Sequence, residues 1–270
     1  AAEAFRNYVA EASPSREKVK VQFALADSLT RMKKFNAARA EFQQLVDWLS
    51  PEDNPYATST EDAKKNRETL EKAQYYVGYC LVNMDAPEGE SIQEVRKRAL
   101  AKLDQFIQNY PKSSRAPKAY NLKGKLLLKM GDNDGAASLY KELAEKYPES
   151  DEGQSALYQL IRSALDIGQV EAANAAFDEM MEDPGAFSAT RFTQIGEMMV
   201  ENSLYENAIK AFEQVQAKKP RKRSLRERAL FGLGKAHFET GDYAGSVTAL
   251  HELTEEYPDT SFFYETKFFN

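Results

Sequence analysis

The sequence predicts an all-α solenoid, a right-handed superhelix of antiparallel helix pairs. The main observation is a fixed interval between two small residues, a large residue and a proline. Three stretches share it: Gly124, Ala136, Tyr140 and Pro148; Gly196, Ala208, Phe212 and Pro220; Gly234, Ser246, Leu250 and Pro258. The second observation is that 13 Gly and 10 Pro among 270 residues are too few for a loop-rich β protein. A fixed period of this length is typical of stacked helical repeats.

Two weaker copies of the interval extend the pattern. They are Ile161, Ala173, Phe177 and Gly185, and Ala26, Ala38, Phe42 and Ser50. In each of them a proline, Pro184 or Pro51, lies one residue from the expected position. Because proline cannot continue a helix, it ends the second helix of each pair. We therefore expect the first helix (helix A) and the second helix (helix B) of six pairs.

Close helix crossing explains the small residues of the interval. We expect the glycines of helix A to contact the small residues of helix B: Gly124, Gly196 and Gly234 against Ala136, Ala208 and Ser246. The large residue one turn further, such as Phe212, should fill the gap toward the next repeat. Short turns such as Gly131-Asp132 and Gly241-Asp242 should join helix A to helix B.

One pair is longer than the others. Nine extra residues separate Gly78 from Ala99, and they fall in the turn-rich stretch 85–90. A second insertion spans 51–60, after which 61–83 reads as one long helix A. Ser91 and Glu94 have capping-box spacing, as do Ser224 and Glu227, and we expect Ser114 and Ser150 to be N-caps.

The repeated interval resembles the tetratricopeptide repeat (TPR). We interpret 1–270 as a single TPR array with repeats at 19–51, 61–111, 114–148, 151–185, 188–220 and 225–258. Residues 1–14 then resemble helix B of a truncated repeat, and 261–270 the start of a further helix. That last segment is rich in aromatic residues: Phe262, Phe263, Tyr264, Phe268 and Phe269. The alternative is a capping helix, which normally has a polar outer face. We expect the chain to be part of a larger multi-repeat protein that can self-associate through this aromatic helix.

The ends of three B helices share a further signature. Tyr-Pro-x-Ser or Tyr-Pro-x-Thr closes the segments 106–113, 143–150 and 253–260. This signature resembles bacterial cell-envelope TPR proteins, including outer-membrane assembly lipoproteins and Tol–Pal-associated proteins. The resemblance implies the bacterial periplasm or cell envelope as the location.

Composition argues against several other classes of protein. The net charge of −6 and pI of about 5.3 do not suit a nucleic-acid partner, which needs a basic surface. Cys80 is the sole cysteine, so neither an internal disulfide nor a C-x-x-C motif exists. No apolar run is long enough to span a membrane. His237 and His251 have no partner residues at metal-ligand spacing, and the sequence 132–135 reads as a turn rather than a calcium loop. We predict no metal, no cofactor and no enzymatic activity.

The TPR resemblance implies a protein–protein interaction scaffold whose A helices line a concave groove. The residues that we expect to face this groove combine aromatic rings with polar and cationic groups: Tyr75, Tyr79, Asn121, Lys125, Tyr158, Arg162, Phe231 and Lys235. Such a surface suits an extended or helical peptide with acidic residues. Asn121 and Lys125 match one pair of the carboxylate clamp found in chaperone-binding TPR proteins, but Tyr75 and Tyr79 depart from it. The alternative is a regulatory or targeting module of a protein with a separate catalytic domain.

A basic run is the second candidate contact surface. It consists of Lys218, Lys219, Arg221, Lys222 and Arg223. It would dock an acidic partner, or it is a solvated loop between repeats in which Lys218 and Lys219 favourably end a helix.

Overall fold

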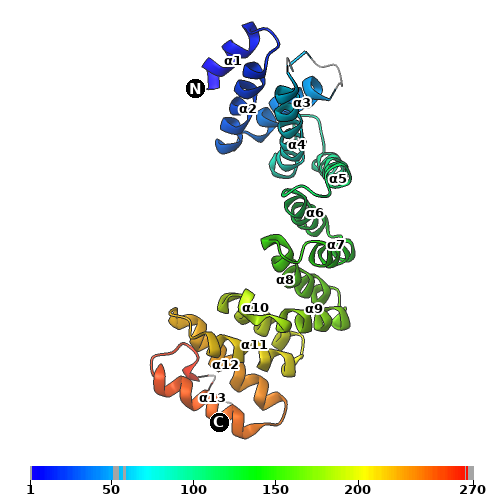
Figure 1. The fold of residues 1–270 in the computed structure, drawn as a ribbon. Helices are drawn as coiled ribbons and strands as arrows, with labels where there is room; N and C mark the ends of the chain where they lie inside the picture. The colour runs from blue at the N-terminus through cyan, green and yellow to red at the C-terminus, as the bar shows by residue number, and fades with distance from the viewer. Residues whose placement is uncertain (1, 51–54, 57–58, 265, 267–270) are drawn as a thin grey trace. The chain divides into compact units, whose positions relative to one another are not determined.

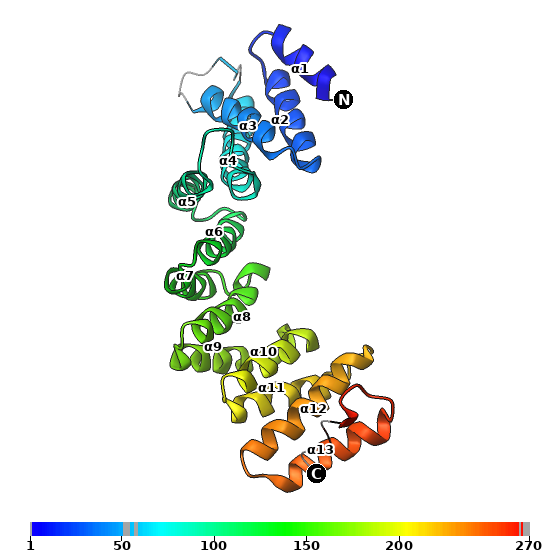
Figure 2. The same cartoon turned by 180° about the vertical axis from the view of Figure 1, so that it is seen from behind.

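A computed structural model describes residues 2–50, 55–56, 59–264 and 266 of the chain. Over these residues the chain forms thirteen α-helices and one short 3-10 helix, with no strand. The prediction of an all-α fold is therefore confirmed. The chain divides into two compact units, Ala1–Met130 and Gly131–Asn270. Figures 1 and 2 show that each unit is a succession of antiparallel helices.

The first unit contains six helices. They are α1 (Ala2–Glu11), α2 (Arg16–Arg31), α3 (Phe35–Leu49), α4 (Thr60–Asn83), α5 (Ile92–Asn109) and α6 (Ala116–Met130). Each helix packs against the next one in the chain, and α4 also contacts both α2 and α6. The A helices α2, α4 and α6 therefore lie side by side, and Phe42 and Leu45 of α3 are fully buried in the core behind them.

The second unit contains seven α-helices. They are α7 (Asn133–Lys146), α8 (Asp151–Asp166), α9 (Val170–Glu182), α10 (Ala189–Glu201), α11 (Tyr205–Lys218), α12 (Arg223–Glu239) and α13 (Tyr243–Glu256), with η1 (Pro184–Ala186) after α9. Here α10 contacts both α8 and α12, so these A helices are also neighbours. The buried residues of α9 and α11 include Phe177 and Phe212, the large residues of the repeated interval.

The turns between helix A and helix B have one recurring geometry. A residue with positive φ follows the A helix in five of them: Lys33, Gly131, Gly168, Ser203 and Gly241. After the glycines of two predicted turns, the aspartates Asp132 and Asp242 each accept a hydrogen bond from a backbone N–H at the start of the next helix. The predicted Gly-Asp turns are confirmed.

The glycines of helix A are in close contact with helix B. The nearest side chain to Gly196 is the ring of Phe212, where an added Cβ would lie 2.7 Å from the ring, and the nearest to Gly234 is Leu250. The predicted contacts of these glycines with Ala208 and Ser246 stay a prediction. The same Phe212 ring also lies against Gly232 of the next A helix, so it fills the gap toward the next repeat as predicted.

Helix starts follow the predictions at two sites. Ser91 and Ser150 cap α5 and α8 by accepting backbone hydrogen bonds. The long helix predicted for 61–83 is α4, and the loop predicted at 85–90 separates it from α5.

Two N-cap predictions were wrong. Ser113, not Ser114, accepts a backbone hydrogen bond, from Arg115. Ser224 lies inside α12, which begins at Arg223 and whose N-cap residue, Lys222, makes no side-chain capping hydrogen bond.

The helix pairs occupy the ranges that the repeat pattern marks, although the single array stays a prediction. The division between the units, after Met130, falls within the third predicted repeat, 114–148. The predicted contact of Gly124 concerns helices of both units and also stays a prediction. Phe268 and Phe269 lie outside the described residues, whereas Phe262 stacks on Phe231 with ring centroids 4.4 Å apart.

Candidate partner-binding surfaces

In the first unit, the expected groove residues differ in accessibility. Tyr75 is buried and packs against Phe106, with ring centroids 5.6 Å apart. Tyr79 is half-buried and meets Phe35 edge-on at 6.1 Å. On α6, Asn121 is half-buried and Lys125 is exposed. Tyr79 and Lys125 are therefore accessible to a partner, whereas Tyr75 mainly joins helices.

Sequence reasoning missed an aromatic residue beside Tyr75. Tyr76 is half-buried, stacks on Phe42 at 4.9 Å and meets Phe23 edge-on at 6.3 Å. It thus connects the A helices α2 and α4 to the core of the first unit. The repeat interval marks no aromatic at this position, so no signal in the sequence singled it out.

In the second unit, Tyr158 of α8 lies beneath an arginine. Its ring is buried, and the guanidinium carbon of Arg191 from α10 lies 4.1 Å from the ring centroid. Arg162, one turn beyond Tyr158, is exposed, and Lys235 on α12 is half-buried. The accessible groups among the expected residues are therefore Arg162, Lys235 and the outer part of Phe231.

An ion pair connects α10 and α12 on the same side of the unit. Arg228 donates from Nε to Oε1 of Glu197 at 2.6 Å and from Nη2 to Oε2. This hydrogen bonding raises the pKa of Arg228. Side chains of successive A helices thus contact each other at two places. Arg228 of α12 contacts Glu197 of α10, and Arg191 of α10 contacts Tyr158 of α8.

The basic run does not form one open patch. Lys218 donates to the backbone oxygen of Pro184 at 2.7 Å and lies over the ring of Phe192. Arg223 binds both Asp259 and Glu227, and these bonds raise its pKa.

Arg221 and Lys222 are exposed, and their side chains form no hydrogen bond or ion pair with another described residue. Lys219 has φ 43° and lines a cleft beside α11. The run therefore divides into structural and solvent-facing residues.

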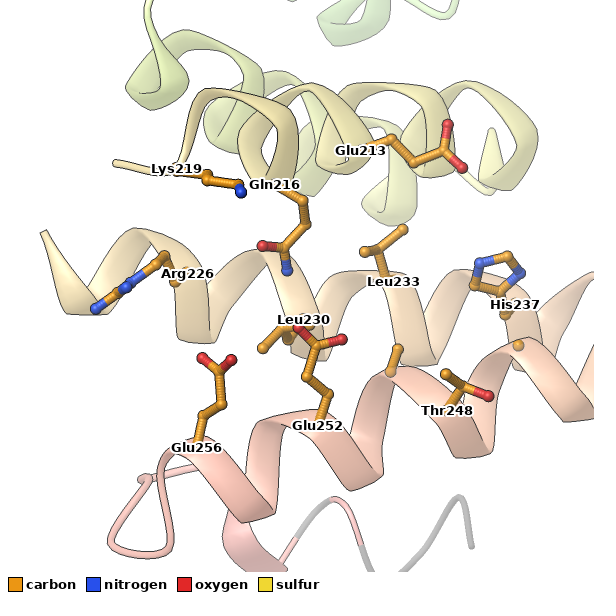
Figure 3. A pocket seen from close by; sticks show the side chains of 12 residues that line it. Glu213, Gln216, Lys219, Arg226, Leu230, Leu233, His237, Thr248, Glu252 and Glu256 are labelled. Atoms are coloured by element: carbon orange, nitrogen blue, oxygen red, sulfur yellow. The ribbon is translucent and has the colours of Figure 1, made fainter. Parts of the chain in front are cut away.

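That cleft lies between α11 and α13, with α12 as its floor, and its volume is about 690 Å³ (Figure 3). Leu230 and Leu233 of α12 form its apolar floor. Gly245 and Ala249, which carry no large side chain, line one of its walls. The rims carry charged and polar groups: Glu213, Gln216, Lys219, Arg226, His237, Glu252 and Glu256. Sequence reasoning did not find the cleft, because the lengths of side chains from three helices together create it.

Comparison with known sequences bears on the nature of these repeats. The tetratricopeptide repeat model matches residues 72–113, 122–150 and 228–260. Three segments of the chain are therefore similar to the tetratricopeptide repeat. They overlap the second, third and sixth repeats that the interval predicts, whose bounds stay a prediction. The sequence comparison with curated proteins gave no match.

Several solved structures of TPR and pilus proteins are similar to the chain. PilF of Pseudomonas aeruginosa has 11% identity and a TM-score of 0.48, over 93% of this chain and 98% of that one. PilW, described as a type IV pilus biogenesis factor, has 15% identity and a TM-score of 0.48, over 90% and 95%. YrrB, described as a TPR protein with an unusual peptide-binding site, has 17% identity and a TM-score of 0.47, over 83% and 96%. At these identities the likeness does not extend to what this chain binds.

The described residues also bear on metal binding and membrane spanning. They contain no group of three or more His, Cys, Asp or Glu side chains placed to hold a metal ion. None of the helices, over the part of the chain that the structure describes, has the length and apolarity needed to cross a bilayer.

Proposed function

We propose that the chain is a non-enzymatic protein–protein interaction scaffold. A partner peptide or protein binds along the A-helix face, the surface formed by α2, α4 and α6 in one unit and by α8, α10 and α12 in the other. The observation that carries this proposal is the contact between A helices of successive TPR repeats. Arg228 with Glu197 and Arg191 with Tyr158 show that side chains from successive repeats meet on this face. A ligand lying across one unit can therefore touch several repeats.

The accessible cations suggest the chemistry of the partner. Lys125, Arg162 and Lys235 form no ion pair with a described residue, Phe231 lies on the same helix as Lys235, and Tyr79 lies on the neighbouring A helix α4. Aromatic rings provide contact area, and cations orient carboxylates. The proposed partner is an extended or helical peptide that alternates apolar and acidic side chains.

Affinity capture with the full chain tests this proposal. The wild type, the double variant Arg162→Ala with Lys235→Ala, and the double variant Arg221→Gln with Lys222→Gln are each used to retain partners from the native cell, and the retained protein is then titrated against each. We expect the first double variant to bind at least about tenfold more weakly, as loss of central anchors does. The second should mainly lower the association rate and its salt dependence. The opposite ranking would place the contact in the loop after α11.

The cell envelope is the proposed location. The Tyr-Pro-x-Ser signature after α5 and α7, and its Tyr-Pro-x-Thr form after α13, support it. Fractionation of the native cell with an antibody against the chain tests it, and recovery in the cytoplasmic fraction would contradict it.

A further inference from the structure

Negative charge is concentrated on three B helices of the second unit. Helices α9, α11 and α13 together carry nine acidic residues and two lysines, and α9 and α13 contain no lysine or arginine. The A helices α8, α10 and α12 carry seven acidic residues and six lysines or arginines, so their charges nearly balance. We call the acidic surface of the three B helices the B-helix face. Its nine carboxylates are all exposed: Glu171, Asp178, Glu179, Glu182, Glu206, Glu213, Glu252, Glu255 and Glu256.

The three helices of this face are neighbours. Asn207 of α11 donates a hydrogen bond to Asn174 of α9 at 2.9 Å, and the cleft of about 690 Å³ lies between α11 and α13. A ligand on this face can therefore contact more than one B helix.

The carboxylates of the B-helix face are not neutralised within the unit. Glu255 is the only one of the nine with an ion-pair partner among the described residues, His251 at 3.6 Å. The first B helix of the unit, α7, differs, because there Lys146 binds Glu142 at 2.7 Å. On α11, the ammonium of Lys218 binds a backbone oxygen instead of a carboxylate. The negative charge of the B-helix face is therefore available to a partner.

Two of these helices end in a way that disfavours the helix itself. The C-terminal end of a helix carries partial negative charge, and like charges one turn apart repel each other. Helix α13 nonetheless ends with Glu252, Glu255 and Glu256, and no basic residue occupies its last turn. In α9, Asp178 and Glu182 are likewise one turn apart near the end. Residues that oppose local stability are expected at functional sites, and a cationic partner would remove this repulsion.

Apolar groups lie beside the acids of α13. Tyr243 is 63% exposed and Val247 is 48% exposed, one turn apart on this helix. A shallow depression lined by Val247 shares Glu252 with the cleft above Leu233. Figure 3 shows Glu213 on one wall of the cleft and Glu252 on the other. Exposed apolar side chains rimmed by charge are typical of protein interaction sites.

The cations that line the cleft are confined to one end of it. Figure 3 shows Lys219 and Arg226 at the end where Glu256 lies. The guanidinium of Arg226 lies over the ring of Tyr257, 5.6 Å from its centroid. The rest of the cleft has no lysine or arginine among its lining residues.

We propose that the B-helix face of the second unit binds a basic amphipathic segment of a partner protein. Lysines or arginines of the segment bind the carboxylates of α9, α11 and α13. An apolar side chain of the segment enters the cleft over Leu233, between Glu213 and Glu252. Opposite charge also steers such a segment to this face and away from the cations of the A-helix face. The site does not depend on the function proposed for the A-helix face.

Peptide titration of the full chain, followed by NMR, tests the chemistry. The probes are short acetylated and amidated amphipathic peptides of leucine with lysine, glutamine or glutamate, and a lysine peptide of the same composition in shuffled order. We expect the amphipathic lysine peptide to bind at least about tenfold more tightly than the glutamine peptide, with an advantage that decreases as salt is added. The shifted amides should belong to α9, α11 and α13. Equal binding of the lysine and glutamine peptides, equal binding of the shuffled peptide, tightest binding of the glutamate peptide, or no binding would each overturn the proposal.

Matched charge variants locate the site. Two triple variants remove the same charge from different helices: E252Q with E255Q and E256Q in α13, and D151N with E152Q and D166N in the A helix α8. We expect the α13 variant to bind the lysine peptide at least about tenfold more weakly and to unfold at a higher temperature, because repulsion at the helix end is removed. The α8 variant should bind like the wild type. Unchanged binding by the α13 variant, or equal losses in both variants, would contradict the site.

A second pair of variants tests the apolar part of the segment. Val247→Ser removes an exposed apolar side chain from α13, and Met32→Ser removes one that is 55% exposed in the first unit. Neither side chain is buried, so both variants should fold like the wild type. We expect Val247→Ser to bind the lysine peptide a few-fold more weakly and Met32→Ser to bind it unchanged. Equal binding by the two variants would contradict an amphipathic partner.

Discussion

At the scale of residues, the turn from helix A to helix B depends on one left-handed backbone position. Gly131, Gly168 and Gly241 occupy it with φ between 73° and 81°, and Lys33 and Ser203 occupy it with φ 57° and 60°. A residue with a Cβ has a steric cost there that glycine does not have. The same turn therefore carries strain in two repeats and none in three.

Ser203→Gly should relieve this strain. We expect the free energy of unfolding to increase by about 0.5–1 kcal/mol, because the steric cost at positive φ exceeds the extra chain entropy of glycine. Urea denaturation followed by circular dichroism measures it. Gly168→Ser is the reciprocal control and should lower stability. A loss of stability with Ser203→Gly would show that the serine side chain contributes more than its backbone strain costs.

Cys80 should make stability depend on alkaline pH. Burial raises the pKa of its thiol to about 11, while Thr30 and Arg39 oppose the shift. Below an unfolded pKa of about 8.5 the thiol is protonated in both states and its contribution is complete. As pH rises from there toward 11, the unfolded thiol ionises first, so stability falls.

The measurement is urea denaturation at about pH 8 and pH 10, where we expect a loss on the order of 1–2 kcal/mol. Cys80→Ala serves as the control, because it removes the thiol and should flatten the pH dependence. Equal slopes in the two proteins would assign the loss to other groups, such as Tyr140, whose pKa burial raises to about 12.

At the scale of helices, one ring joins two helix pairs in the second unit. Phe212 of α11 is fully buried, and it lies against Gly196 of α10 and Gly232 of α12. The glycines allow both A helices to approach the same side chain. Packing between these repeats thus depends on Gly196 and Gly232, which lack the Cβ that would collide with the ring.

Replacing Gly232 with alanine should disturb this contact. The added Cβ would overlap the Phe212 ring, which is held by its buried surroundings. We expect a loss of about 1–3 kcal/mol in the free energy of unfolding, as overpacking causes. Ala217→Leu on the exposed side of α11 is the control and should change stability little. Thermal and urea unfolding measure both, and an unchanged midpoint for Gly232→Ala would show that the ring moves aside freely.

The ion pair between Arg228 and Glu197 should contribute modestly. Both side chains are 37% exposed, so solvent screens them. A double-mutant cycle with Arg228→Gln and Glu197→Gln should give a coupling of about 0.5–1 kcal/mol that decreases as salt is added. A coupling that salt does not change would indicate hydrogen bonding without a charge contribution.

The sequence predicts the helices better than it predicts their contacts. The interval of small, large and proline residues marks where helices begin and end and where the turns between them lie. It can do so because helix ends and turns depend on residues close in the sequence, such as glycine and proline. It does not show that the Phe212 ring lies against Gly196, since periodicity identifies recurring positions but not the direction of each side chain.

For the candidate sites, the sequence identifies candidate residues but does not show whether their side chains are accessible. Tyr158 occupies the expected A-helix position, yet Arg191 from the next A helix covers its ring. The cleft above Leu230 arises from the lengths of side chains on three helices, so no motif in the sequence could mark it.

At the scale of the whole molecule, the chain divides into two compact units. Trp48 is the sole tryptophan and belongs to the first unit, where it stacks on Tyr56 with centroids 4.9 Å apart. Its fluorescence therefore reports unfolding of the first unit, whereas circular dichroism reports helices of both. Solenoid repeats contact mainly their neighbours, so their stability is approximately a sum of local contributions.

A destabilising change in the second unit should therefore separate these two signals. We expect Gly196→Leu, which overpacks Phe212, to lower the midpoint of the circular dichroism transition by urea and to leave the Trp48 midpoint nearly unchanged. Gly78→Leu is the reciprocal variant, because a Cβ at Gly78 would lie 2.9 Å from Leu103 in the first unit, and it should shift the Trp48 signal first. If both probes shifted equally in both variants, the two units would unfold together as one cooperative structure.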